Sequence, residues 1–408
     1  MDNMMLWITL VCNVLIVFAF AVTPFVTRKT ELFGVSLPSS EIKRFELSEM
    51  RRAYLRAVLM SGAALIAVNI ILFLIISHEM AQTRIYLILI FAYVAVAFMI
   101  YLVFHKKMVA FKAAQPWRAH GAAANAGRAF GREAAESPET VASPEAATSS
   151  GIAESAEPVL VVDTSPPGRE VVRPAWLWLF AAIGGGTLLY LWKIWPSLPD
   201  RIPMNMDTSG VVVEFMGKGP GAFFTMMLAQ WIIIGVFIMV YFMIPAAKRQ
   251  IDAANPEVSR EQGRRFRYRM SACMVFCGAA LAAIVGILPV AMAQSDGGMA
   301  FVVGPLVATM AVVVVMLVVM FRAGQGGSKL DVGTVEPSAE YKRMANTDDD
   351  KYWKLGVFYF NPKDPAFLVE KRFGIGWTVN FGKPAGLLLI VGIIAVVVVA
   401  LVIGYSSV

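Results

Sequence analysis

The sequence predicts an all-α polytopic membrane bundle of about eight transmembrane helices with a small cytoplasmic β-rich module. Of its 408 residues, 58% are hydrophobic and only 16% are charged, whereas soluble domains contain about 45–50% apolar and about 25% charged residues. The apolar residues form runs of about twenty, the length needed to cross a bilayer core of about 30 Å. Basic residues gather in alternate loops between these runs, as is typical of cytoplasmic loops.

Eight apolar runs have the length of a membrane span. They cover residues 4–26, 56–77, 84–104, 175–195, 222–246, 270–292, 298–321 and 385–406. Only Asp2 precedes the first run as a charged residue, whereas Arg28 and Lys29 follow it. A cleaved signal peptide carries its positive charge before the apolar run, so we expect an uncleaved helix.

The loops after the first, third, fifth and seventh runs are basic, and the alternate loops contain few positive charges. With eight helices, this pattern predicts that both termini lie outside and that every basic loop is cytoplasmic. The net charge of +7 then indicates contact with anionic lipid rather than with nucleic acid. In particular, the basic cluster at residues 264–269 is expected to anchor against the lipid bilayer.

The runs and the breaks between them divide the chain into five predicted parts. The segment 113–157 is rich in Ala, Ser, Glu, Pro and Gly and is predicted to be a disordered cytoplasmic linker. The other parts are a three-helix unit at 1–112, a four-helix unit at 158–321, a tether and aromatic module at 322–384, and a last helix at 385–408.

The aromatic module contains two turn signals, Asn361-Pro362 and Asp364-Pro365, which separate predicted strands at 355–360 and 366–371. A β-prone run at 158–164 lies on the same side of the membrane, and we expect it to pair with the module. Eight residues are the candidate functional residues of this module: Trp353, Tyr359, Asn361, Asp364, Lys371, Arg372, Trp377 and Asn380.

Few polar residues lie inside the predicted spans. Asn13, Asn69 and Gln230 are candidates for hydrogen bonds between helices, and Asn69 and Gln230 could alternatively line a pore. Lys193 lies at an outer end beside tryptophans, where a lysine can reach the headgroups, although an ion pathway is the alternative. Small residues recur at every fourth position and predict close helix packing at Gly278, Ala282, Gly286, Gly304 and Ala308.

The spans contain no Ser/His pair, paired aspartates or His/Glu metal set of the kind that intramembrane enzymes need. Three cysteines and three histidines predict neither a disulfide framework nor a zinc or haem centre. The outer-loop carboxylates Asp200, Asp207 and Glu214 do not have the spacing of a calcium loop. We therefore expect no enzyme activity, no catalytic or metal-binding residues and no cofactor.

The outer loop 196–221 is rich in proline and glycine and is expected to hold a defined shape. Its candidate ligand-binding residues are Pro199, Asp200, Arg201, Pro203, Asn205, Asp207, Gly210 and Lys218. The run Leu-Pro-Asp-Arg-Ile-Pro-Met at 198–204, followed by Gly210 and Lys218, resembles the bacterial membrane family of domain of unknown function 1648. That domain also occurs in the immunity protein that protects Bacillus cells from the SDP killing peptide. The family pattern often has His in place of Asn205.

The segments 30–38, 161–165 and 349–381 resemble cytoplasmic signatures of longer members of that family. The resemblance implies a non-enzymatic, multi-pass protein of the bacterial cytoplasmic membrane that senses, or confers immunity to, an extracellular peptide or envelope stress. A passive transporter, a lipid-handling protein and an accessory subunit of a larger complex are the alternatives. The corresponding partners would be an extracellular peptide, another membrane protein or a second copy in a homodimer.

Overall fold

The computed structural model describes residues 3–28, 30–37, 45–76, 79–115, 161–163, 170–206, 211–252, 255–294, 299–333, 350–389 and 391–392. Within these residues, seven helices are long and apolar enough to cross a membrane, and they correspond to the first seven predicted spans. The predicted last span and the predicted linker lie mostly outside the described residues, although residues 384–389 are helical.

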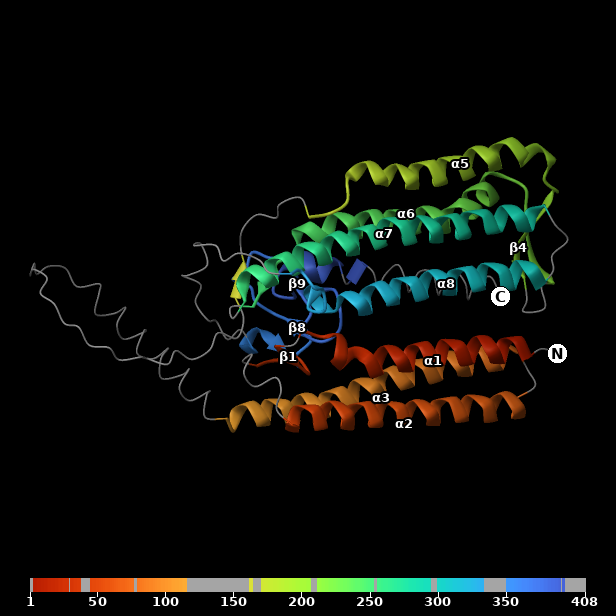
Figure 1. The fold of residues 1–408 in the computed structure, drawn as a ribbon. Coiled ribbons are helices and arrows are strands. Elements are labelled where there is room, and N and C mark those ends of the chain that lie inside the picture. Colours follow the sequence, from red (N-terminus) through yellow and green to blue (C-terminus); the bar gives the residue numbers. More distant parts are fainter. Residues whose placement is uncertain are drawn as a thin grey trace, which may run out of the picture.

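The seven long helices run nearly side by side and form two units (Figure 1). The first unit consists of α1 (Asn3–Val26), α2 (Phe45–Ile75) and α3 (Glu79–Ala113). The second consists of α5 (Trp178–Ile194), α6 (Pro220–Ala246), α7 (Pro256–Ala293) and α8 (Met299–Ala323). The rings of Phe18 on α1 and Phe321 on α8 meet at a centroid distance of 5.4 Å, which links the two units.

Three helices exceed by ten or more residues the roughly 20 residues that a bilayer requires. They are α2, α3 and α7, with 31, 35 and 38 residues. Their charged ends all lie at the same end of the bundle, where most of the short strands also gather (Figure 1). This end is called the module end below, and the opposite end is called the hairpin end.

Two-stranded sheets occupy both ends. The hairpin end carries β4 (Arg201–Met206) and β5 (Val212–Gly217), which pair antiparallel (Figure 1). The other pairs lie at the module end: β1 (Glu31–Leu32) with β2 (Val35–Ser36), β3 (Val161–Asp163) with β6 (Arg249–Ile251), β7 (Trp353–Lys354) with β8 (Phe358–Tyr359), and β9 (Leu368–Glu370) with β10 (Trp377–Val379).

The structure corrects two expectations about these strands. The predicted strand 355–360 is wrong in its first half, because Leu355 and Gly356 have φ of +54° and +71° and form the turn between β7 and β8. The described residues of the run at 158–164, which are 161–163, do not pair with the module directly. They form β3, which pairs with β6, and Lys248 just before β6 forms a bridge to Val369 of β9.

The predicted small residues on α7 allow close packing within the chain. A Cβ atom at Gly278 would lie 2.5 Å from the ring of Phe237 on α6, and one at Gly286 would overlap the amide of Gln230. Both contacts join neighbouring helices, as expected for a stripe of small residues. Gly304 on α8 differs, because no described atom lies within 4 Å of its Cβ position.

Candidate functional site

The C-terminal module, defined here as residues 350–383, lies between the two helix units. Its Phe373 contacts the first unit, with a ring distance of 4.3 Å to Tyr101 on α3 and 6.2 Å to Tyr54 on α2. Its Trp377 contacts the second unit, with a ring distance of 5.6 Å to Phe266 on α7. One small module therefore packs against both groups of helices.

An arginine–glutamate cluster lies at the centre of this junction. The carboxylate of Glu370 on β9 accepts a hydrogen bond from Arg28, just after α1, and lies 3.8 Å from Arg267 on α7. Glu170, before α5, lies 3.9 Å from Arg267 and 3.3 Å from Arg249 on β6. All five side chains are at most 11% exposed, so the cluster joins five chain segments in a largely dry environment.

Arg267 has a second role, which corrects the expectation that the whole basic cluster at 264–269 faces lipid. Its guanidinium donates to the carbonyl oxygens of Ile244 (3.2 Å) and Ala247 (2.9 Å). These carbonyls lie at the C-terminus of α6, where a positive charge is favourable. Arg264 and Arg265 remain accessible and pair with Glu261 on the same helix.

A second cluster ties the start of the module to the first helix unit. The Nζ atom of Lys112, at the end of α3, lies 2.6 Å from Asp350, which also pairs with Arg372. The hydroxyl of Ser36 on β2 donates to the same carboxylate at 2.8 Å. Burial alone would raise the pKa of Asp350, but Arg372 and Lys112 lower this pKa to about 2. Asp350 is therefore held ionised by cations from two segments.

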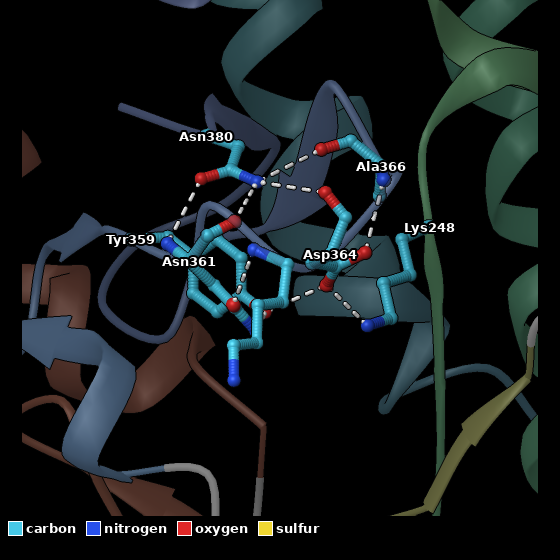
Figure 2. Close-up of polar contacts among 7 residues, drawn as sticks. Lys248, Tyr359, Asn361, Asp364, Ala366 and Asn380 are labelled. Atoms are coloured by element: carbon cyan, nitrogen blue, oxygen red, sulfur yellow. Dashed lines mark hydrogen bonds and ion pairs between the residues drawn. The ribbon is translucent and has the colours of Figure 1, made fainter. Parts of the chain in front are cut away.

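A third cluster ties the module to the end of α6 (Figure 2). Lys248 lies 2.5 Å from Asp364, and the hydroxyl of Tyr359 donates to the same carboxylate oxygen at 2.7 Å. Burial acts to raise the pKa of Asp364, but the hydrogen bonds from Lys248 and Tyr359 outweigh it and lower the pKa. The backbone of Lys248 also donates to the carbonyl of Leu368 at 2.8 Å.

Asn380 organises the turn that carries Asp364 (Figure 2). Its side-chain amide donates to the carbonyls of Asn361 (2.9 Å) and Ala366 (3.1 Å), and its side-chain oxygen accepts from the backbone N–H of Asn361 at 3.1 Å. Asn380 is fully buried. It thus supplies partners for backbone groups that would otherwise be unpaired in a buried loop.

Two close backbone approaches also require glycine at the junction. Gly356 has φ of +71°, and a Cβ atom there would lie 2.6 Å from the hydroxyl of Tyr101 and 2.8 Å from the ring of His105. Gly326, in the short helix η4 (Gln325–Gly327), has φ of +58°, and its Cβ would overlap the guanidinium of Arg28. Both positions allow the chain to cover a polar side chain at contact distance.

Most of the predicted module residues come together at this junction. Trp353 stacks under Arg372 at 5.1 Å, and Tyr359, Asn361, Asp364 and Asn380 form the network of Figure 2. Trp377 packs on α7. Lys371 is partly buried, and burial lowers its pKa.

Sequence reasoning missed the partners of these residues. Arg28, Lys112, Lys248 and Arg267 were interpreted only as loop charges, and Glu370 and Glu170 were not singled out. The available signal was weak, because a lysine or arginine that follows an apolar run is explained equally well by membrane orientation.

The predicted ligand-binding residues of the outer loop serve mainly their own hairpin. Lys218 donates through Nζ to the carbonyls of Pro196 (3.1 Å) and Leu198 (2.7 Å). Its backbone N–H donates to the backbone carbonyl oxygen of Asp200 at 2.8 Å. Pro203 is buried, whereas three residues are exposed: Pro199, Asp200 and Arg201. Two lie outside the described residues, Asp207 and Gly210, and for Asn205 only the backbone in β4 is described.

Two of the three predicted intramembrane polar residues form hydrogen bonds inside the bundle. Asn69 donates to the carbonyl of Leu65 one turn earlier at 3.0 Å. Gln230 donates to Thr187 on α5 at 3.1 Å and to the carbonyl of Ala282 on α7 at 3.2 Å, which is helix-to-helix bonding. Lys193 is exposed at the hairpin end of α5. In the described part of the chain, no group of three or more His, Cys, Asp or Glu side chains could hold a metal ion.

A family model described as a family of unknown function (DUF5808) matches residues 362–387. This segment includes β9, β10 and Asn380, so it covers the second half of the C-terminal module. No curated protein and no solved structure matches the chain. By helix length and hydropathy the chain is a multi-pass membrane protein, and its module contains a segment similar to that family of unknown function.

Proposed function

We propose that the protein is a non-enzymatic membrane sensor, in which the module end reports the relative position of the two helix units. The observation that carries this proposal is the placement of Glu370. This residue lies on the module and pairs with Arg28 of the first unit and with Arg267 of the second. A small displacement of either unit would separate buried charges, which is costly, so the junction couples the position of one unit to that of the other.

The stimulus in this proposal is an extracellular peptide or another envelope stress that acts at the hairpin end. The β4–β5 hairpin presents exposed apolar side chains at Val211, Val213 and Phe215, which suit an amphipathic peptide. The resemblance of loop 198–218 to the family of domain of unknown function 1648, and so to a killing-peptide immunity protein, supports the same stimulus.

The proposed location is the bacterial cytoplasmic membrane, with the hairpin end outside. The distribution of basic residues supports this orientation. Besides Arg28, Lys112, Lys248 and Arg267, which are buried or partly buried, the module end carries exposed basic residues that include Arg52, Lys106, Lys107 and Arg264. The hairpin end carries Arg84, Lys193, Arg201 and Lys218. A membrane-protein partner, or a second copy of the chain, would then respond to the state of the module on the cytoplasmic side.

The experiment compares a deletion strain with the same strain expressing the full chain. Both are exposed to the peptide fraction of the organism's own culture supernatant, and membrane potential is followed with a voltage-sensitive dye. We expect depolarisation at a lower peptide dose in the deletion strain. The full chain with Lys218→Met should protect less, because this change frees two carbonyls of the hairpin loop. Lys106→Met is the matched control, because Lys106 is exposed on α3 and lies outside both the hairpin and the C-terminal module. Identical dose responses in all four strains would contradict the proposal.

A further inference from the structure

A small cavity lies inside the first helix unit at the hairpin end. It has a volume of about 30 Å³, and its polar lining comes from three helices: Thr9 on α1, Asn69 on α2, and Gln82 and Tyr86 on α3. Because a single water needs about 10–15 Å³ by this measure, the space is sufficient for one or two waters or a side-chain-sized polar group.

Two buried polar groups, one lining this cavity and one a helical turn beyond it, have no nitrogen or oxygen partner among the described residues. Asn13 lies one helical turn deeper than Thr9, on the same face of α1. It is fully buried, and neither of its amide atoms has a hydrogen-bond partner. The buried hydroxyl of Tyr86 has no nitrogen or oxygen partner, and the thiol of Cys12 on α1, a weak hydrogen-bonding group, lies beside it. Such groups are rare in native proteins because leaving them unpaired costs free energy, and more so in a membrane.

The lining determines what kind of group could pair with them. No lining side chain carries a charge, and Thr9, Asn69, Gln82 and Tyr86 offer both donors and acceptors. A charged ligand would remain uncompensated there. Asn69 and Gln82 already donate to backbone carbonyls of α2 or of the turn after it, which leaves Asn13 and Tyr86 as the groups with unused hydrogen-bonding capacity.

We propose that this cavity, extended to Asn13, is a binding site for a small neutral hydrogen-bonding group, an amide or a hydroxyl, of which water is the smallest source. The site is separate from both the hairpin and the C-terminal module, and it does not depend on the sensor function proposed above.

Cysteine accessibility tests the site in the full chain in proteoliposomes. The background replaces Cys12 by serine, which keeps a polar group beside Tyr86, and Cys273 and Cys277 by alanine. Single Thr9→Cys and Asn13→Cys variants in this background are exposed to iodoacetamide. The control is Val11→Cys, which lies between them in depth but is 47% exposed on the outside of the helix. Because a thiol must ionise to react, labelling requires a polar, hydrated site, and we expect rates at least about tenfold above the control.

Thr9→Cys keeps the test decisive if Asn13→Cys does not fold. Labelling of Thr9→Cys at the control rate would overturn the proposal. If labelling is fast, it is repeated in the presence of acetamide, which competes for the site if the site binds amides. Protection by acetamide assigns the site to amides, and fast labelling without protection assigns it to water. If acetamide protects Thr9→Cys, adding Asn13→Leu to this variant should weaken the protection by about fivefold, which is the effect of losing one hydrogen bond.

Discussion

At the hairpin end, Lys218 donates to carbonyls of its own loop and Asp200 is exposed. At the module end, Glu370 is buried between Arg28 and Arg267, which come from different helix units. Both ends contain charged residues, but the bonds of the hairpin end stay within one loop, whereas those of the module end join two helix units. The hairpin contacts are local in sequence, whereas Glu370 is 342 residues from Arg28 and 103 residues from Arg267.

This difference has an energetic consequence. An exposed ion pair contributes about 0–1 kcal/mol, whereas removing one partner of a buried pair costs about 3–5 kcal/mol because it leaves a charge unpaired. The module end should therefore tolerate substitutions poorly, and the hairpin end should tolerate them well. The following predictions test that contrast, from the largest expected effect to the smallest.

Replacing Glu370 by alanine should have the largest effect. It leaves Arg28 without its carboxylate partner and Arg267 with Glu170 alone, so we expect the free energy of unfolding to fall by about 3–5 kcal/mol. The measurement is SDS-titrated unfolding in mixed micelles. Glu261→Ala is the matched control, because Glu261 pairs with Arg264 and Arg265 on an accessible helix surface. Equal losses for the two variants would contradict a special role for the junction.

Gly356→Ala should lower the free energy of unfolding by about 2–3 kcal/mol, because it combines a positive φ with a collision against Tyr101. Gly333→Ala separates these two causes. Gly333 also has a positive φ of +69°, but no described atom lies within 4 Å of its Cβ position, so about 1 kcal/mol is expected. Unfolding of the two variants at the same SDS concentration would contradict the close approach of Gly356 to Tyr101 on α3.

Asp350→Asn should lower stability near neutral pH by about 2 kcal/mol, and the loss should disappear in acid. The pKa of Asp350 is about 2 in the folded protein, compared with an ordinary value of 3.8. A carboxylate with a lowered folded-state pKa stabilises the protein above the unfolded-state pKa, and this contribution is lost as pH falls through the folded-state value. Thermal unfolding midpoints of the two proteins should therefore converge between pH 4 and pH 2, and parallel profiles would refute the prediction.

Lys218→Met should have the smallest effect, a change of less than about 1 kcal/mol in the free energy of unfolding. The lysine is not part of the junction, and its hydrogen bonds hold only the loop before β4. Limited proteolysis should detect faster cleavage near residues 196–200, while the module stays intact. A loss comparable to that of Glu370→Ala would remove the contrast between the two ends.

The membrane helices could be predicted from the sequence because twenty consecutive apolar residues have few alternatives to a span. The tertiary partners could not. The β-prone run at 161–163 indicated a strand, but nothing in its composition distinguished β6 from the module as its neighbour. In the same way, the module's Asp364 was singled out as part of a turn, while its partner Lys248 was interpreted as a loop charge.

Arg267 illustrates the limit most clearly. It lies among five basic or aromatic neighbours that predict a lipid-facing cluster, yet it is fully buried and binds the end of α6. Helical periodicity distinguishes faces only where apolar and polar residues alternate, and this segment is polar on nearly every side. The seven spans were thus predictable, whereas the contacts that position the module were not.

The most direct test of the junction is a distance measurement between the two helix units. Spin labels at exposed positions, Leu59 on α2 and Phe242 on α6, can be introduced by cysteine substitution in a background without native cysteines and measured by double electron–electron resonance in nanodiscs. The wild-type background and Glu261→Gln should give one narrow distance distribution, and Glu370→Gln should give a broad or shifted one. An unchanged narrow distribution in Glu370→Gln would contradict the claim that the module's buried charges fix the two units relative to each other.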